Sequence, residues 1–295
     1  MKKFTKMWAI AACALFAGTA AVNAEDYTWK FVTAGDATTY AIRSDGSLWS
    51  WGWNEKGQGG NGVSERTATP TLADGNRVWK KAVGGKAYGF FLAEDGSLWA
   101  AGTHEGGVQG TNDGIDHKVL TRIGTDNDWA DMACSRFWGY SGFAIKTNGT
   151  LWAWGKNSAG QLGIGNTQAQ TAPVQVGADM DWKQVAAGCS SVLALKTDGS
   201  LWGWGFNMYS ELFGHEGKQL SPVRLGSETD WEQVVVIDFR AYAVKKDGTL
   251  WAWGDNANNL LGFNTPTEEE TTAEGNPVEV VTVPQITAPT HVTSI

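Results

Sequence analysis

The chain has 295 residues, of which 42% are hydrophobic and 18% charged, and its formal net charge is −8. An acidic balance of this kind is a poor match for a phosphate backbone, so the composition argues against a nucleic-acid partner. It is compatible with a soluble chain and with a basic protein partner.

The first 24 residues are predicted to be a secretory signal peptide and not part of the fold. Lys2, Lys3 and Lys6 form a positive segment, an apolar run follows, and small residues lead to Ala24 just before Glu25. This order is typical of an export signal cleaved after Ala24. The apolar run is too short to span a bilayer and no later segment approaches that length, so we expect a secreted, periplasmic or cell-surface protein without a membrane span. Cleavage would leave 20 basic and 31 acidic residues, a net charge of −11.

Five copies of one eight-residue pattern divide the rest of the chain. Each copy reads Asp or Asn, Gly, Ser or Thr, Leu, Trp, a small residue, Trp or Ala, and Gly. The copies follow one another at steps of 50, 53, 50 and 49 residues, and a period of this size predicts repeated supersecondary units. They occupy residues 45–52, 95–102, 148–155, 198–205 and 247–254.

Each copy is predicted to form the turn and the second strand of a β-hairpin. In the first copy an alternating segment precedes residues 45–46, and Asp-Gly between alternating runs favours a two-residue type I′ turn. That turn would place Ile42 opposite Trp49 and Tyr40 opposite Trp51. One face of the hairpin would then be bulky and aromatic, and the other small.

Two further strands are predicted in every repeat. One begins at a tryptophan before the hairpin, and one follows a glycine-rich loop after it, usually starting at a proline that suits an edge strand. Four short strands in about 50 residues make one propeller blade, and no segment shows a helical period. The first strands begin at Trp29, Trp79, Trp129, Trp182 and Trp231, and the fourth strands are expected at residues 70–72, 119–123, 173–176, 222–225 and 277–280.

We therefore predict an all-β fold, a β-propeller of five four-stranded blades. The repeats extend over residues 25–281 of the mature chain, and residues 282–295 form a C-terminal tail or reinforce the last blade. Sheets with one bulky and one small face stack in series, and the last must meet the first or leave an apolar face exposed. This favours a closed ring over an open solenoid. The alternative is an incomplete ring, or a part of a longer gene product.

The repeat unit resembles the regulator of chromosome condensation repeat. The likeness rests on Trp-x-x-Val, Asp-Gly-[Ser/Thr]-Leu-Trp-x-Trp-Gly, Gly-Gln-Leu-Gly and Pro-Val, and it is best across residues 146–165 and 182–205. The resemblance implies a β-propeller, commonly of seven blades, so five is a departure. Exported bacterial members of this family are the nearest analogues in compartment, and there the resemblance implies binding of another protein through loops on one face. The family often has histidine seven residues before the turn aspartate, where this chain has Thr38, Tyr88, Ser141, Ser191 and Arg240.

Aromatic residues that depart from the repeat are the candidate partner-binding residues. The regular tryptophans are best explained as core, whereas an aromatic and arginine cluster on one rim would resemble a protein-binding hot spot. Packing within the loops is the competing explanation. The candidates are Trp53, Tyr88, Phe137, Trp138, Tyr140, Phe206, Phe239 and Arg240.

The sequence supports no catalytic, metal or cofactor site. Cys134 and Cys189 lack the close spacing of a zinc site and are expected to be two thiols or, at lower weight, a disulfide. The histidines share no ligand spacing, and no nucleophile elbow is present. Asp36, Asp131 and Asp238 lie near the first loops of their blades, where paired carboxylates could hydrolyse a glycoside. This enzyme hypothesis ranks last of three.

Two binding hypotheses rank above it. The first is an exported, monomeric, non-enzymatic propeller that binds an extracellular or periplasmic protein through one loop face. The second is a lectin-like propeller with glycan sites between the blades.

Overall fold

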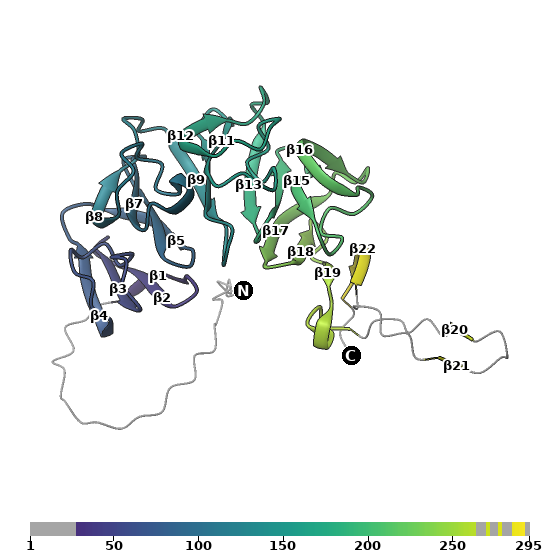
Figure 1. The fold of residues 1–295 in the computed structure, drawn as a ribbon, viewed down its shortest axis with the longest axis horizontal. Helices are drawn as coiled ribbons and strands as arrows, with labels where there is room; N and C mark the ends of the chain where they lie inside the picture. Colours follow the sequence, from purple (N-terminus) through teal and green to yellow (C-terminus); the bar gives the residue numbers. More distant parts are fainter. Residues whose placement is uncertain (1–27, 264–269, 272–276, 279–284, 293–295) are drawn as a thin grey trace, which may run out of the picture.

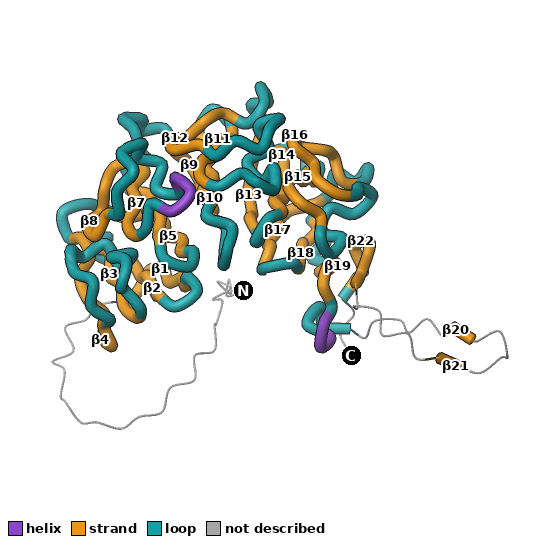
Figure 2. Tube along the Cα trace, viewed as in Figure 1, coloured by secondary structure: helices purple, strands orange, loops and turns teal. Residues whose placement is uncertain are grey.

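The computed structural model describes residues 28–263, 270–271, 277–278 and 285–292 of the chain. These residues form five four-stranded antiparallel sheets and one two-stranded sheet (Figure 1). Helical structure in the described chain is limited to two three-residue 3₁₀ turns, η1 (Glu105–Gly107) and η2 (Ala257–Asn259) (Figure 2). None of the described helices is long and apolar enough to cross a bilayer. The predicted all-β fold of five four-stranded blades is confirmed.

Each blade is a meander in which consecutive strands pair. Blade 1 contains β1 (Trp29–Ala34), β2 (Thr38–Arg43), β3 (Leu48–Gly52) and β4 (Thr67–Asp74). Blade 2 contains β5 (Trp79–Gly84), β6 (Tyr88–Ala93), β7 (Leu98–Gly102) and β8 (His117–Arg122). Blade 3 contains β9 (Trp129–Cys134), β10 (Ser141–Lys146), β11 (Leu151–Gly155) and β12 (Gln170–Gln175). Blade 4 contains β13 (Trp182–Ala187), β14 (Ser191–Lys196), β15 (Leu201–Asn207) and β16 (Gly217–Leu225). Blade 5 contains β17 (Trp231–Ile237), β18 (Arg240–Lys245), β19 (Leu250–Asp255) and β22 (Gln285–His291).

The last blade takes its fourth strand from further along the chain than predicted. The sequence placed that strand at residues 277–280, but β22 pairs with β19 instead, with His291 opposite Trp251. Pro277–Val278 forms β21, which pairs with β20 (Glu270–Thr271) outside the blade. Pro277 correctly predicted the start of a strand. A local sequence pattern does not determine which sheet a strand joins, and this strand pairs outside blade 5.

The blades follow one another along an open arc. Neighbouring blades pack through their inner strands, as β1 with β5, β5 with β9, β9 with β13, and β13 with β17. In Figure 1 the described strands of blade 1 and blade 5 lie at opposite ends of this arc and do not meet. The closed ring predicted from the sequence is therefore wrong for the described chain. The angle between blades is set by how each sheet packs on the next, and repeat number alone does not fix it.

The hairpin turn has one more residue than predicted, and this shifts the register of every blade. Arg43 N–H donates to the Ser47 carbonyl at 3.1 Å, which closes a three-residue loop with Gly46 at φ +86°. A left-handed glycine in this place is the usual three-residue alternative to a type I′ turn. Ala41 then lies opposite Trp49, not Ser50. A shift by one residue moves side chains to the other face, so the tryptophans and the large strand-two residues occupy different faces.

The core consists of the four junctions between blades. Each junction packs the tryptophan face of one blade on the aliphatic face of the blade before it. Between blades 3 and 4, Trp182 and Trp204 pack with Phe143, Ile145 and Leu151. The corresponding clusters join blades 1 and 2, 2 and 3, and 4 and 5. Of the hairpin tryptophans predicted as core, Trp154, Trp204 and Trp253 are fully buried. The first tryptophan of each hairpin is only half-buried, and in blades 2 to 5 it packs against the edge of a core cluster.

A lysine at the end of the second strand stabilises the turn side of blades 3, 4 and 5. In blade 4, Lys196 Nζ lies 5.0 Å from the ring of Trp182 and 4.5 Å from that of Trp202. It also lies 2.8 Å from Asp179 and 3.1 Å from Asp181. Burial alone would lower the pKa of Lys196, but the hydrogen bonds that Lys196 donates to these two carboxylates outweigh the burial and raise the pKa. This side of each blade is therefore occupied by structural contacts.

Candidate functional site

The first and third loops of all blades lie at one end of the sheets. In an antiparallel meander the loop after the first strand and the loop after the third strand emerge at the same end. We call this end the loop rim, formed by residues 35–37 and 53–66 of blade 1, the equivalent loops of blades 2 to 4, and residues 238–239 and 256–263 of blade 5. All eight predicted partner-binding residues lie in or beside these loops. The Asp-Gly turns occupy the opposite end.

Blade 3 presents the most exposed aromatic side chains of the rim. Its first loop is longer than those of the other blades and holds Phe137, 46% exposed, and Trp138, 66% exposed. Phe137 has φ +48°, a strained conformation for a residue other than glycine. Lys86 of blade 2 places its Nζ 3.7 Å from the centre of the Trp138 ring. This cation–π contact holds the indole above the neighbouring blade, where its remaining surface faces solvent.

Charged groups gather beside these aromatics at the mouth of the central channel. Arg136 reaches from blade 3 to blade 1 and donates to the Ala34 carbonyl at 3.3 Å. Partial burial raises the pKa of Asp36, and the nearby Asp238 carboxylate adds to this, while Arg136 opposes it. The mouth thus combines a bridging guanidinium with carboxylates from the first and last blades.

Blade 5 contributes a second aromatic pair with blade 4. The rings of Phe239 and Tyr209 lie 4.8 Å apart at an angle of 47°. Arg240 beside them donates to Asp255 at 3.2 Å and lies 3.9 Å from Asp238. The guanidinium is therefore committed to intramolecular ion pairs and orients this part of the rim.

Four predicted residues lie apart from this cluster. Tyr88 is fully buried and donates to the Ser135 carbonyl at 2.6 Å, and Tyr140 is 5% exposed with its ring 6.0 Å from that of Tyr88. Trp53 and Phe206 are half-buried at the ends of the third strands. Tyr88 and Tyr140 support the loop that carries Trp138, but they offer little surface to a partner.

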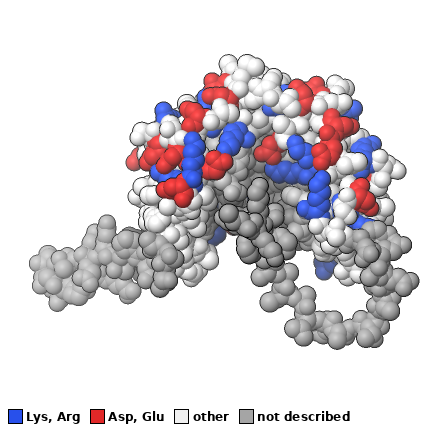
Figure 3. Space-filling model, turned by 180° about the vertical axis from the view of Figure 1, so that it is seen from behind, with Lys and Arg blue, Asp and Glu red and all other residues white. Residues whose placement is uncertain are grey.

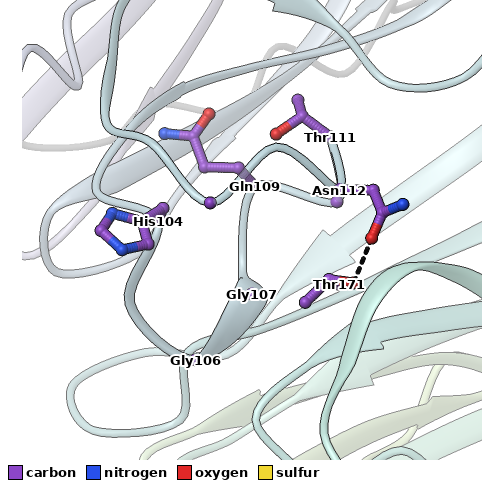
Figure 4. Close-up of a pocket in the computed structure, with 9 residues that line it drawn as sticks. His104, Gly106, Gly107, Gln109, Thr111, Asn112 and Thr171 are labelled. Atoms are coloured by element: carbon purple, nitrogen blue, oxygen red, sulfur yellow. Dashed lines mark hydrogen bonds between the residues drawn. The ribbon is translucent and has the colours of Figure 1, made fainter.

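The cavities of the described chain differ in size, and one of about 340 Å³ lies between blades 4 and 5 beside Phe213, Trp231 and Trp251. The channel between the inner strands holds about 200 Å³, below the roughly 300–1,000 Å³ of typical ligand pockets. A smaller cavity of about 120 Å³ lies between the third loop of blade 2 and β12 (Figure 4). There Thr171 donates to Asn112 at 2.5 Å and joins the two blades (Figure 4). A depression of about 500 Å³ beside Trp53 is lined by few residues, Ala37, Gly52 and Arg66 among them.

The cysteines at the channel are unsuited to nucleophilic chemistry. Both are free thiols in the structure. Burial raises the pKa of Cys134 and that of Cys189 to about 12, so both are protonated at neutral pH. Among the described residues no group of three histidine, cysteine, aspartate or glutamate side chains is arranged to hold a metal ion.

The structure adds residues to the rim that the repeat pattern did not single out. Lys86 and Arg136 were missed because charged loop residues carry no signal of their own when no distance is known. Tyr209 lies in the third loop of blade 4, the shortest such loop of the first four blades. The short length of this loop, compared with the third loops of blades 1 to 3, could have singled out Tyr209 from the sequence.

Sequence comparison identifies the repeats. Two models described as the regulator of chromosome condensation (RCC1) repeat match this chain, one at residues 45–92 and 148–195 and the other at residues 29–58. The ultraviolet-B receptor UVR8 of Arabidopsis thaliana is 30% identical over 163 residues, which are 54% of this chain and 37% of UVR8. Human protein RCC2 is 27% identical over 150 residues, 50% of this chain and 19% of RCC2. The chain thus matches about a third or less of the length of these relatives.

Solved structures show the same fold. Yeast RCC1 (Prp20), in its complex with Kap60, superposes with a TM-score of 0.75 at 19% identity and covers 92% of this chain, which covers 62% of Prp20. Human WBSCR16 superposes with a TM-score of 0.74 at 17% identity, over 91% of this chain and 68% of WBSCR16. At 17–19% identity, these superpositions show that the fold is shared.

Proposed function

We propose that this chain, whose β-propeller blades are similar to RCC1 repeats, is a non-enzymatic binding protein that holds a protein partner on its loop rim. The observation that carries this proposal is the exposed pair Phe137 and Trp138, which project from the longest first loop beside Arg136. Aromatic and arginine side chains are the residues most enriched in binding hot spots. The small channel cavity favours a macromolecule over a small ligand.

Relatives support a protein partner in general terms. Yeast RCC1 (Prp20) has been solved bound to Kap60, and its binding to Gsp1p and histones has been described. These partners belong to that protein. For this chain the proposed partner is an extracellular or periplasmic protein, and the acidic net charge suits a basic one. On the face seen in Figure 3, acidic and basic side chains are interspersed.

Most junctions do not suit a glycan, whereas the cavity beside Trp231 and Trp251 between blades 4 and 5 is within the size range of ligand pockets and keeps a glycan as the second candidate. Sugar sites between blades would need exposed tryptophan faces at the junctions. The first-strand tryptophans of blades 2 to 5 are at most 4% exposed, and their indoles pack on the preceding blade.

The Trp138→Ala variant is expected to lose at least tenfold in affinity for the partner, because truncating a hot-spot aromatic costs upward of about 1.4 kcal/mol. The measurement is capture from the exported or surface proteome with the chain from Glu25 as bait, followed by titration of the enriched protein. Met180→Ala is the matched control, because Met180 is 62% exposed on the turn side of the blades. Equal capture by both variants would contradict the site.

Export is proposed together with this function. Expression of the full gene is expected to yield a protein whose first residue is Glu25, because the segment before it has the order of a signal peptide. Amino-terminal sequencing of protein from the periplasm and the medium tests this. A chain retained in the cytoplasm with its first 24 residues intact would refute it.

A further inference from the structure

The four junctions between blades use one repeated pair of surfaces. The tryptophan face of each later blade carries its first-strand tryptophan, such as Trp79, and the aliphatic face of each earlier blade carries the leucine of its third strand, such as Leu48. These third-strand leucines of blades 1 to 4 are all 0% exposed, and the first-strand tryptophans of blades 2 to 5 are 0–4% exposed.

Hydrogen bonds repeat at these junctions as well. The backbone N–H of Trp79 donates to the carbonyl of Gly46 in the preceding turn at 2.9 Å, and the equivalent bonds of the next three junctions measure 3.1–3.2 Å. At three junctions a third-strand indole also donates to a loop carbonyl of the preceding blade. Trp204, for example, donates to Gln161 at 2.8 Å. Each junction is thus specified by shape and by polar groups.

The two ends of the arc are the two halves of one more junction. Among the described residues no blade precedes blade 1, and Trp29 is 49% exposed where its equivalents are buried. Trp51, the equivalent of Trp204, is half-exposed on the same face. No blade of the described chain follows blade 5, and Leu250 is 39% exposed where its equivalents are fully buried. Leu260, in the third loop of blade 5, is 50% exposed.

We propose that blade 1 of one copy docks on blade 5 of a second copy, so that the chain associates head to tail through its end faces. The junctions inside the chain indicate what should bind each exposed end face. Four times in the described chain, a tryptophan face is covered by the sheet face that carries the third-strand leucine of the preceding blade. Blade 5 leaves the equivalent face, with Leu250, exposed. A second copy carries that face. The proposal departs from the monomer expected from the sequence.

Size and symmetry set the expected strength and form of this association. A four-stranded face with strands about 4.8 Å apart and about five residues long measures roughly 19 by 17 Å. Two such faces bury less than the roughly 1,600 Å² of a standard interface, so we expect a dissociation constant of tens of micromolar or weaker.

The number of blades determines the form of the assembly. Two five-bladed arcs together have more blades than the seven common in this family, so joined copies cannot close a flat ring. They should form an open spiral that lengthens with concentration.

Sedimentation equilibrium of the chain from Glu25, up to about 500 μM, tests the proposal. The wild-type chain is expected to show a weight-average mass that rises steadily with concentration. Trp29→Glu should remove the docking face of blade 1 and Leu250→Glu that of blade 5, so each variant alone stays monomeric. An equimolar mixture of the two still has one intact face of each kind, and is expected to form one-to-one dimers and nothing larger.

Val119→Glu is the matched control, because Val119 is 57% exposed on β8, away from both end faces, and this variant should associate like the wild type. Circular dichroism checks that each variant is folded, and Trp29→Ser and Leu250→Ser replace any that is not. A wild-type chain that stays monomeric, a variant that associates normally, or a mixture that stays monomeric overturns the proposal.

Discussion

The Trp79→Ala variant is expected to lose about 3–5 kcal/mol of unfolding free energy, the usual cost of truncating a fully buried large side chain. Trp79 is 0% exposed and packs with Tyr40, Ile42 and Leu48 of the preceding blade. Its indole N–H also donates to Asp74 at 3.1 Å, so the variant removes a hydrogen bond together with the packing. Urea unfolding followed by circular dichroism measures the change.

Trp29→Ala is the matched control for this prediction, because Trp29 holds the same repeat position in blade 1. It is 49% exposed, since no blade of the described chain precedes it, and we expect a loss of about 1 kcal/mol or less. The comparison isolates the junction, because residue type and strand position are the same in both variants. Similar losses for the two variants would show that the tryptophan acts within its own blade.

The Glu211→Gln variant is expected to be more stable than the wild-type chain at neutral pH, because the wild-type chain must bury an ionised carboxylate there. Glu211 is 0% exposed at the junction of blades 4 and 5. It accepts the Tyr209 N–H at 2.8 Å and contacts the Ser191 hydroxyl at 3.3 Å. Burial raises the pKa of the Glu211 carboxyl, and the nearby Asp255 carboxylate adds a smaller rise. The hydrogen bonds that Glu211 accepts lower the pKa, but burial outweighs them. A glutamine keeps the contacts and carries no charge.

The sign of the pH dependence follows from the raised pKa. Below the ordinary value of 4.5 the carboxyl is protonated in both the folded and the unfolded chain, so the charge costs nothing. As the pH rises above 4.5 the unfolded chain ionises first, and the wild-type chain loses stability until the folded carboxyl also ionises. The advantage of Glu211→Gln should therefore appear above pH 4.5 and vanish below it.

Blade 3 supplies the reciprocal control. Gln161 holds the same position as Glu211, and its side-chain oxygen accepts the Ala159 N–H at 2.9 Å. Gln161→Glu is expected to lower the unfolding free energy at neutral pH and to recover it on acidification. Thermal unfolding from pH 4 to pH 8 measures both variants. A difference between Glu211→Gln and wild type that does not change with pH would contradict this account.

The sequence predicted where on the blades the candidate site lies better than it predicted which residues are exposed there. Antiparallel pairing within each repeat directed all eight candidates to one end of the blades before any distance was known. Exposure could not be predicted, because Tyr88 is covered by the neighbouring blade 3 at Ser135. Arg136 was missed because its contact with Ala34 joins residues 102 positions apart. Whether these residues bind a partner is still a prediction.

The sequence by itself determined the blade, because a repeat of about 50 residues with fixed glycine, leucine and tryptophan positions contains all the local information for four short strands and their turns. Only the tertiary structure decided the hairpin register, the origin of the last strand and the opening of the arc. These depend on packing between sheets, such as Trp182 on Leu151, where small differences in side-chain fit set the angle from one blade to the next.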